Sequence, residues 1–378
     1  MTVLLIRLRL IGDVVLSTPV IRALRRTFPE AKLVYLVERD AAAVVEHNPH
    51  LDEVMVVERS RGVARIIDDF RLGWRLRRRR FDLVIDMHGG PRSSWLARAT
   101  GAPRRVGYDM AGRRWMYTHM VARPRKLRPR HSVVNQWDLL AAVHGWSREA
   151  PDPTRDAVEM PLDVAADGRI AARLAASGVR PDDSLVVIHV SANNPFRRWP
   201  EPAFTELVVG LVRASEDRRI VLSSGPSDRQ AAVRIAEAAR RALGPSEAAR
   251  VLDFGEFDLA ELRALIGRSC LFIGGDSGPL HIAATTETPI VAVYGPTLPV
   301  RSTPWRDPRL VTESVEIEGL PCRPCEQRVC APGDYRCLTT VRSGDVLAAA
   351  ERALGRNRTR AGRARGDARL IELDGPRA

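Results

Sequence analysis

Several loops in this sequence combine glycine with acidic, basic or histidine side chains, the residue types that move protons or bind anions. The first runs from Arg9 to Pro19 and places Asp13 beside Gly12, directly after an apolar run. A carboxylate in that position could accept a proton from a substrate hydroxyl, as a general base does. It could instead cap the following helix, a common position for aspartate. The loop lacks a G-x-G-x-x-G pattern, which argues against a nicotinamide-type dinucleotide site.

Two loops in the second half of the chain have features of anion-binding sites. Residues 189–200 join a Ser/Asn-rich turn to Arg197 and Arg198, and guanidinium groups match phosphate oxygens in pairs. Residues 273–284 form a glycine-rich turn that leads into a helix, whose free backbone N–H groups would attract an anion. The residues of interest in this turn are Asp276, Ser277, Gly278, Pro279 and His281. A solvated basic loop and a packed histidine are the alternative interpretations.

A fourth loop, residues 81–94, also follows an apolar run. It could present Asp86, His88 and Arg92 to a shared cleft, although turn capping and surface charge would explain these residues equally well.

Four of the five cysteines form a cluster near the C-terminus. They are Cys322, Cys325, Cys330 and Cys337. In a long cytosolic chain such a cluster suggests a structural zinc or iron–sulfur site. The spacing matches no standard zinc module, so reduced thiols or a redox pair remain the alternatives.

Short apolar runs alternate with amphipathic stretches throughout the chain, which predicts an α/β protein with parallel strands. Residues 148–163 are rich in proline and aspartate and read as a linker between two halves. We therefore expect two α/β domains, over residues 1–155 and 164–354, followed by a basic, disordered tail over 355–378. Ligands in such sheets bind at the carboxyl ends of strands, where these loops lie.

Composition excludes several classes of protein. The 378 residues are 45% hydrophobic and 28% charged, which excludes a largely disordered chain. No targeting signal and no spanning apolar stretch is evident, so we expect a cytoplasmic protein. The net charge of +13 could indicate nucleic-acid binding, but aromatic residues are only 5% and no recognised module appears, so no nucleic-acid partner is expected.

Together these loops resemble glycosyltransferase family 9, the ADP-heptose:lipopolysaccharide heptosyltransferases. The resemblance rests on residues 6–24, 82–89, 197–200, 275–284 and 289–297. The cysteine cluster also looks like one found in members resembling heptosyltransferase II. The resemblance implies a GT-B fold, in which two Rossmann-like domains with parallel sheets face a central cleft. It further implies an inverting transfer of heptose from ADP-L-glycero-D-manno-heptose to the lipopolysaccharide inner core, with no catalytic metal.

The resemblance also implies residue roles. Asp13 falls where the family keeps its general base, and Gly12, His88 and Arg92 would lie on the acceptor side. Arg197 falls where the family usually has a lysine that reaches the donor phosphates. The other positions on the donor side are Arg198, Asp228, Asp276, Ser277, Gly278, Pro279 and His281, with Asp228 a candidate for the ribose.

The charge distribution suits an anionic partner. Arginines concentrate over residues 59–80, 98–130 and 352–378, and two of these clusters lie in the half expected to hold the acceptor. They would favour an anionic glycolipid and the inner leaflet of the inner membrane, so we expect a peripheral protein. The alternatives are a transferase with another nucleotide-sugar or acceptor, or a non-catalytic nucleotide-sugar or nucleic-acid-binding protein. The sequence does not determine the oligomeric state.

Overall fold

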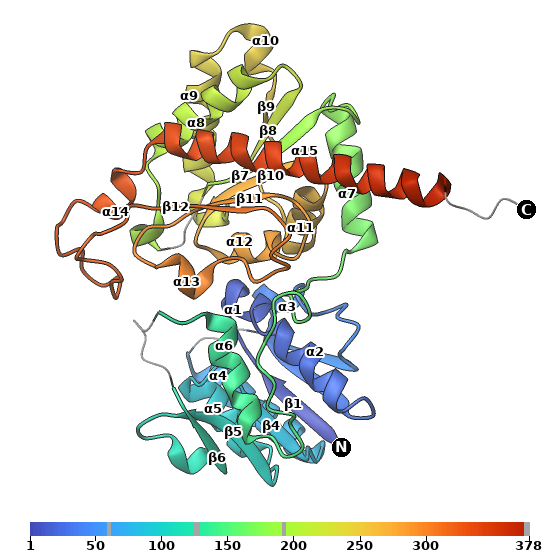
Figure 1. Cartoon of the computed structure of the whole chain (residues 1–378). Helices are drawn as coiled ribbons and strands as arrows, with labels where there is room; N and C mark the ends of the chain where they lie inside the picture. Colours follow the sequence, from blue (N-terminus) through green and yellow to red (C-terminus); the bar gives the residue numbers. More distant parts are fainter. Residues whose placement is uncertain (59–61, 124–128, 191–193, 374–378) are drawn as a thin grey trace, which may run out of the picture.

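The computed structural model describes residues 1–58, 62–123, 129–190 and 194–373, which form two six-stranded sheets (Figure 1). Every strand pairing in both sheets is parallel. The N-terminal sheet contains β1 (Thr2–Ile6), β2 (Lys32–Glu38), β3 (Glu53–Val57), β4 (Leu83–Asp86), β5 (Arg104–Asp109) and β6 (His119–Ala122). The C-terminal sheet contains β7 (Ser184–His189), β8 (Arg218–Ser223), β9 (Val251–Asp253), β10 (Leu271–Gly275), β11 (Ile290–Val293) and β12 (Thr312–Val315).

Both sheets have the same strand order. It is β3-β2-β1-β4-β5-β6 in the first and β9-β8-β7-β10-β11-β12 in the second, which is the doubly wound, Rossmann-like order. This confirms the predicted fold class. The longer helices that cover the sheets are α2 (Thr18–Thr27), α4 (Gly62–Arg78), α5 (Pro91–Ala99), α7 (Val164–Ala176), α8 (Glu201–Ala214), α9 (Arg229–Ala242), α11 (Leu259–Gly267) and α15 (Ser343–Leu373). The short helices are α1 (Ile11–Val15), α3 (Arg39–Ala42), α6 (Ser132–Trp137), α10 (Pro245–Ala248), α12 (Gly278–Ala283), α13 (Pro299–Ser302) and α14 (Arg336–Thr339).

The N-terminal sheet is buried on both faces because its strands are apolar at successive positions. Leu4 and Ile6 of β1 pack in one cluster with Leu72 of α4 and Leu96 of α5. The intervening Leu5 packs in another cluster, with residues of α2. Side chains of a strand alternate between its two faces, so α4 and α5 cover one face and α2 covers the other.

Two helices differ from the sequence-based expectation. The sequence of residues 137–144 is typical of a helix, but the helix begins earlier, as α6, because the ring of His131 accepts a hydrogen bond from Val133 N and caps it. A short 3-10 turn then covers Asp138–Ala142. The final helix α15 continues to Leu373, whereas composition predicts a disordered tail after residue 354. Alanine and arginine both have high helix propensity, which accounts for the extension.

The two halves meet where α1, which follows β1, reaches α12, which follows β10. A single cluster of buried apolar side chains runs from the N-terminal sheet to the C-terminal sheet, and α1 packs directly on α12. In Figure 1 these two short helices lie at the boundary between the halves. Among the described helices, none is both long and apolar enough to cross a membrane.

Candidate active site

The junction of α1 and α12 depends on two glycines. A Cβ atom on Gly12 would lie 2.7 Å from Cδ2 of His281, and one on Gly278 would lie 3.1 Å from Cβ of Ile11. Real Cβ atoms do not approach other atoms as closely as 2.7 Å, so any side chain at position 12 would push the helices apart. Both glycines predicted as site residues are therefore needed to bring the two loops together.

Asp13 lies in the first turn of α1, on the N-terminal side of this junction. Its carboxylate forms an ion pair with Arg7, which follows β1 and also donates a hydrogen bond to the Met87 carbonyl oxygen. The N-cap residues of α1 and α2 are Leu10 and Ser17, so Asp13 caps neither helix. About a third of its side chain (31%) remains exposed, which leaves the carboxylate accessible to a ligand.

The backbone before Asp13 is strained. Leu10 has φ of 66° and leaves 65% of its surface exposed, an unusual combination for a large apolar residue. Strain of this kind persists only where the surrounding structure imposes it, and it concentrates at functional sites.

Two histidines flank Asp13, and both are held neutral. Burial lowers the pKa of His88 to about 4, with the charges of Arg7 and Arg9 adding to the effect. Burial also lowers the pKa of His281, while Asp276 and Asp13 oppose that shift. In the described part of the chain, Nδ1 of each ring is buried without a hydrogen-bond partner. Two neutral imidazoles with an unused nitrogen thus lie near the carboxylate.

The C-terminal side of the junction holds a cavity of about 340 Å³ at the carboxyl ends of β7, β10 and β11. Arg197 and Arg198 line it together with Asp228, Gly274 and Gly275. Arg198 lies 3.1 Å from an oxygen of Asp228. The structure therefore brings these predicted residues into one pocket; residues 191–193 of the same loop lie outside the described residues.

Arg197 links this cavity to the glycine-rich turn. Its Nη1 lies 3.1 Å from the Asp276 carboxylate and donates to the Asp276 carbonyl oxygen at 2.9 Å. Asp276 in turn lies 4.0 Å from Nε2 of His281. Ser277 is the N-cap residue of α12, but its hydroxyl donates to the Gly275 carbonyl oxygen and does not cap the helix. Arg197, Asp276 and the neutral His281 therefore form a row of polar side chains that leads from the cavity toward Asp13.

Sequence reasoning missed three residues of the site. Arg7 orients Asp13, and its position directly after β1 was an available signal. Burial lowers the pKa of Arg301 in α13; the charge of Asp276 opposes that shift, and the charge of Arg197 adds to it. Gln327 accepts hydrogen bonds from Arg197 Nε at 2.9 Å and from the Asn194 amide at 2.7 Å. No local pattern in the sequence marks Gln327, which reaches the site from the cysteine-rich segment.

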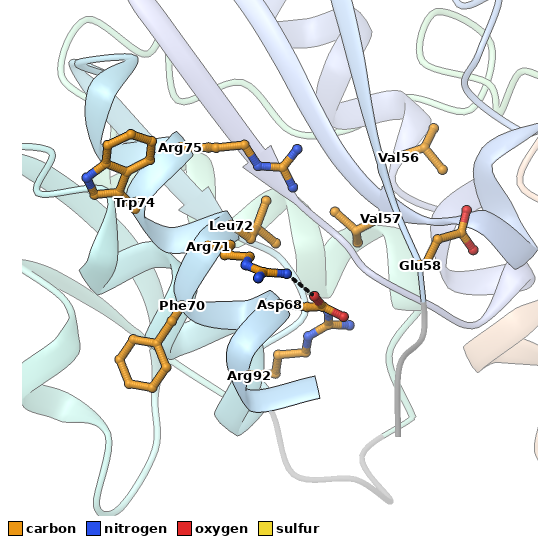
Figure 2. Close-up of a pocket in the computed structure, with 10 residues that line it drawn as sticks. All are labelled: Val56, Val57, Glu58, Asp68, Phe70, Arg71, Leu72, Trp74, Arg75 and Arg92. Carbon is orange, nitrogen blue, oxygen red and sulfur yellow. Dashed lines mark ion pairs between the residues drawn. The ribbon is translucent and has the colours of Figure 1, made fainter. Parts of the chain in front are cut away.

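Arg92 and Asp86 have structural partners instead. Arg92 contacts Glu38 at 2.6 Å and Asp69 at 2.8 Å, and it lines a separate cavity beside α4 (Figure 2). Asp86 is fully buried and accepts four hydrogen bonds, from His88 N, Gly89 N, the Ser93 hydroxyl and the Tyr117 hydroxyl. The turn-capping interpretation therefore describes Asp86, and the structure does not bring Arg92 to Asp13.

Comparison with known proteins places this arrangement in a family. The model of glycosyltransferase family 9 (heptosyltransferase) matches residues 70–335. This chain belongs to glycosyltransferase family 9. It is 26% identical over 354 residues to a lipopolysaccharide heptosyltransferase 3 of Escherichia coli, a match that covers 92% of this chain and 97% of the relative.

Solved structures of family 9 share the fold. A family 9 glycosyltransferase from Veillonella parvula has a TM-score of 0.79 at 23% identity, covering 93% of this chain and 97% of that one. The E. coli ADP-heptose lps heptosyltransferase II has a TM-score of 0.73 at 18% identity, covering 95% and 100%. The two facing Rossmann-like halves are thus the GT-B arrangement, and the chain is a glycosyltransferase.

The cysteine cluster of this glycosyltransferase does not form a ligand set. Burial raises the pKa of Cys337 to about 11; the charge of Arg323 opposes that shift, and Cys322, Cys325 and Cys330 add to it. Within the described ranges, however, no three cysteine, histidine or acidic side chains gather closely enough to hold a metal ion. The zinc or iron–sulfur site at these cysteines remains a prediction.

Proposed function

We propose that this glycosyltransferase transfers heptose from ADP-L-glycero-D-manno-heptose to an anionic sugar of the lipopolysaccharide inner core, with inversion. The observation that carries the proposal is the α1–α12 junction, which sets an accessible carboxylate opposite a cationic pocket. The names of its relatives support the donor and the acceptor class. The N-terminal half, residues 1–155, would bind the acceptor, and residues 164–354 would bind the ADP-sugar.

Asp13 is the general base in this proposal. The acceptor oxygen attacks the anomeric carbon of the heptose, and its proton passes to a carboxylate oxygen of Asp13. Arg7 orients that carboxylate, with which it forms an ion pair. His88, held neutral by burial, could donate one hydrogen bond to an acceptor oxygen without adding charge. Gly12 lets His281 approach the loop that carries Asp13.

The donor side stabilises the leaving group. As the bond from the anomeric carbon to the β-phosphate oxygen breaks, ADP gains negative charge that cations must balance. Arg197 and Arg301 supply that charge near Asp276, and Ser277, Gly278, Pro279 and His281 form the turn beside them. Asp228, which pairs with Arg198, would accept a hydrogen bond from the ribose in this proposal.

The decisive experiment is to incubate the protein with ADP-heptose and truncated lipopolysaccharide acceptors and to weigh the products. We expect a mass gain of one heptose with the wild type. Asp13→Asn should fold normally but lose about 10²–10⁴-fold in turnover, the usual contribution of a general base. Near-wild-type turnover by this variant would remove Asp13 from that role.

Calorimetry with ADP and UDP separates this function from its nearest alternative. Tighter binding of ADP without transfer of heptose, but with transfer of another sugar from its ADP-sugar, would indicate another donor. Tighter binding of ADP without transfer from any ADP-sugar would indicate a nucleotide-sugar sensor. We further propose that the enzyme works on the cytoplasmic face of the inner membrane, where a lipid-linked acceptor would be presented.

A further inference from the structure

One face of α4 exposes large apolar side chains in a continuous row. Ile66, Phe70 and Trp74 follow each other at intervals of four residues, and Ile67 lies beside them. Their exposed fractions are 57% for Ile66, 63% for Phe70, 59% for Trp74 and 47% for Ile67. We call these four residues the α4 face. The helix is anchored by its other side, where Leu72 and Leu76 pack on the sheet, and the α4 face is turned toward solvent.

Arginines border the α4 face. Arg71 and Arg75 form the neighbouring row along the helix, and the guanidinium of Arg78 stacks over the Trp74 ring at 4.0 Å. Residues 62–80 carry seven arginines and two aspartates, so the helix and its end are strongly basic. An apolar row flanked by arginine is the pattern of a helix that lies in the interface of an anionic membrane.

A cavity of about 890 Å³ lies between α4 and the end of β3. Figure 2 shows Arg71, Arg75 and Arg92 around it, with Val56 and Val57 on the β3 side and the rings of Phe70 and Trp74 on the other side of the helix. Arg71 lies 3.7 Å from Asp68, an exposed ion pair that contributes little and exchanges readily. Glu58 and Asp68 also line the cavity, and Arg92 is already paired with two acidic side chains. The groups that could bind an anionic lipid headgroup beside the apolar wall are therefore Arg71 and Arg75.

The α4 face is part of a rigid surface. The ring of Phe70 meets that of Trp95 on α5 edge to face, with centroids 5.2 Å apart. A Cβ on Gly73 would lie 2.9 Å from Trp95, so the two helices are closely packed. On the far side of α5, the 3-10 turn Arg114–Met116 adds Trp115, which is also largely exposed. Rigid exposed aromatics are suited to the water–lipid boundary, because one end of each ring is apolar.

We infer that the α4 face docks on an anionic lipid bilayer, with Phe70 and Trp74 inserted among the headgroups and with Arg71 and Arg75 paired to lipid phosphates. Charge complementarity selects this occupant over a neutral surface, since the face is apolar at its centre and cationic at its border. Docking would bring the enzyme to its lipid-linked acceptor, and this part of the inference rests on the proposed function. Docking itself is testable without donor or acceptor.

The test is co-sedimentation of the full-length protein with vesicles of phosphatidylglycerol and phosphatidylethanolamine, compared with vesicles of phosphatidylcholine. We expect the wild type to bind the anionic vesicles, and Phe70→Ser/Trp74→Ser to lose about tenfold or more of its partition constant. The matched control, Leu162→Ser/Val164→Ser, removes exposed apolar surface at the start of α7 and should change binding by less than about twofold. Phe70→Leu/Trp74→Phe keeps the face apolar and should retain binding.

Several outcomes would overturn the inference. One is a wild type that binds neither vesicle type or binds both equally well. Another is a Phe70→Ser/Trp74→Ser variant that binds anionic vesicles as well as the wild type does. A concentration-dependent dimer that only the serine variant loses, with vesicle binding unchanged, would assign the face to a second copy of the chain. Transfer to a delipidated core oligosaccharide in solution should be the same for wild type and serine variant. Failure of that transfer in the wild type would overturn the proposed function and leave the vesicle result standing.

Discussion

At the scale of single residues, glycine is the type that the site cannot replace. Gly12 and Gly278 come from different sheets, and each approaches the opposing loop at a distance that excludes a Cβ atom or forces its neighbours to move. Two aspartates in similar sequence contexts can have different surroundings in the folded protein. Asp13 follows an apolar strand and Asp86 ends one. The Asp13 carboxylate is partly exposed and pairs with Arg7, whereas the Asp86 carboxylate is buried and accepts four hydrogen bonds.

Gly12→Ala tests the close approach. The new Cβ would collide with His281, so we expect a loss of about 1–3 kcal/mol in the free energy of unfolding, typical of overpacking. Transfer activity should fall as well, because the carboxylate and the donor pocket separate. Urea unfolding and product assays measure the two effects. Gly168→Ala, in α7 with no atom within 4 Å of its Cβ, is the control and should stabilise by about 0.5–1 kcal/mol. A stable, active Gly12→Ala enzyme would contradict the packing argument.

At the scale of elements, the cysteine-rich segment between β12 and α15 contacts the loop that carries Arg197, a residue of the proposed donor site. Gln327 accepts from Arg197 and Asn194, and the Arg323 guanidinium donates to the Thr297 carbonyl oxygen at 3.0 Å. These contacts fix the segment on the loop that follows β11. The segment thereby holds the guanidinium of Arg197 in position, whatever its thiols do.

Gln327→Asn tests this link between the segment and the donor site. Position 327 has φ of 59°, which asparagine tolerates, but its shorter side chain cannot reach Arg197. Loss of one hydrogen bond to a charged group is worth about 1.5 kcal/mol, so ADP should bind about tenfold more weakly. Isothermal calorimetry measures the affinity. Arg328→Gln, at the exposed neighbouring position, should bind ADP as the wild type does. Unchanged affinity of Gln327→Asn would show that Arg197 needs no support from this segment.

At the scale of the whole molecule, buried histidines tie stability to pH. Burial lowers the pKa of His88, His131 and His189 to about 4 each, while an unfolded chain titrates near 6.5. Between these values the unfolded state binds more protons than the folded state. Stability is therefore fully present above pH ~6.5 and is lost as the pH falls toward ~4.

His189→Gln should weaken this acid dependence. Each neutral buried histidine adds a slope of about 1.4 kcal/mol per pH unit in that window, and the variant removes one of them. Glutamine can keep a hydrogen bond to the Ser223 hydroxyl, which lies 3.0 Å from Nδ1 of His189. Urea unfolding at several pH values between 4.5 and 7.5 measures the slope. A variant with the wild-type slope would contradict burial as the source of the effect.

Much of the fold follows from local pattern. The apolar runs at residues 3–8, 32–37 and 271–273 predict strands. A strand that is buried on both faces is apolar at nearly every position, so it reads as a short continuous apolar run. The end of α15 escaped prediction because a basic, low-complexity composition is compatible with both disorder and helix. Likewise α6 begins where His131 caps it, and histidine is not a usual capping residue.

The sequence by itself determined the chemistry that is available: a carboxylate after the first strand, paired arginines after β7 and a glycine turn after β10. Spacing along the chain carries that information because the carboxyl ends of parallel strands share an edge. Tertiary structure alone decided which groups meet. It brought Arg301 and Gln327 to the site from distant segments, and it turned Arg92 toward Glu38 and Asp69. Partners separated by tens to hundreds of residues are set by packing between sheets and helices, which no local pattern encodes.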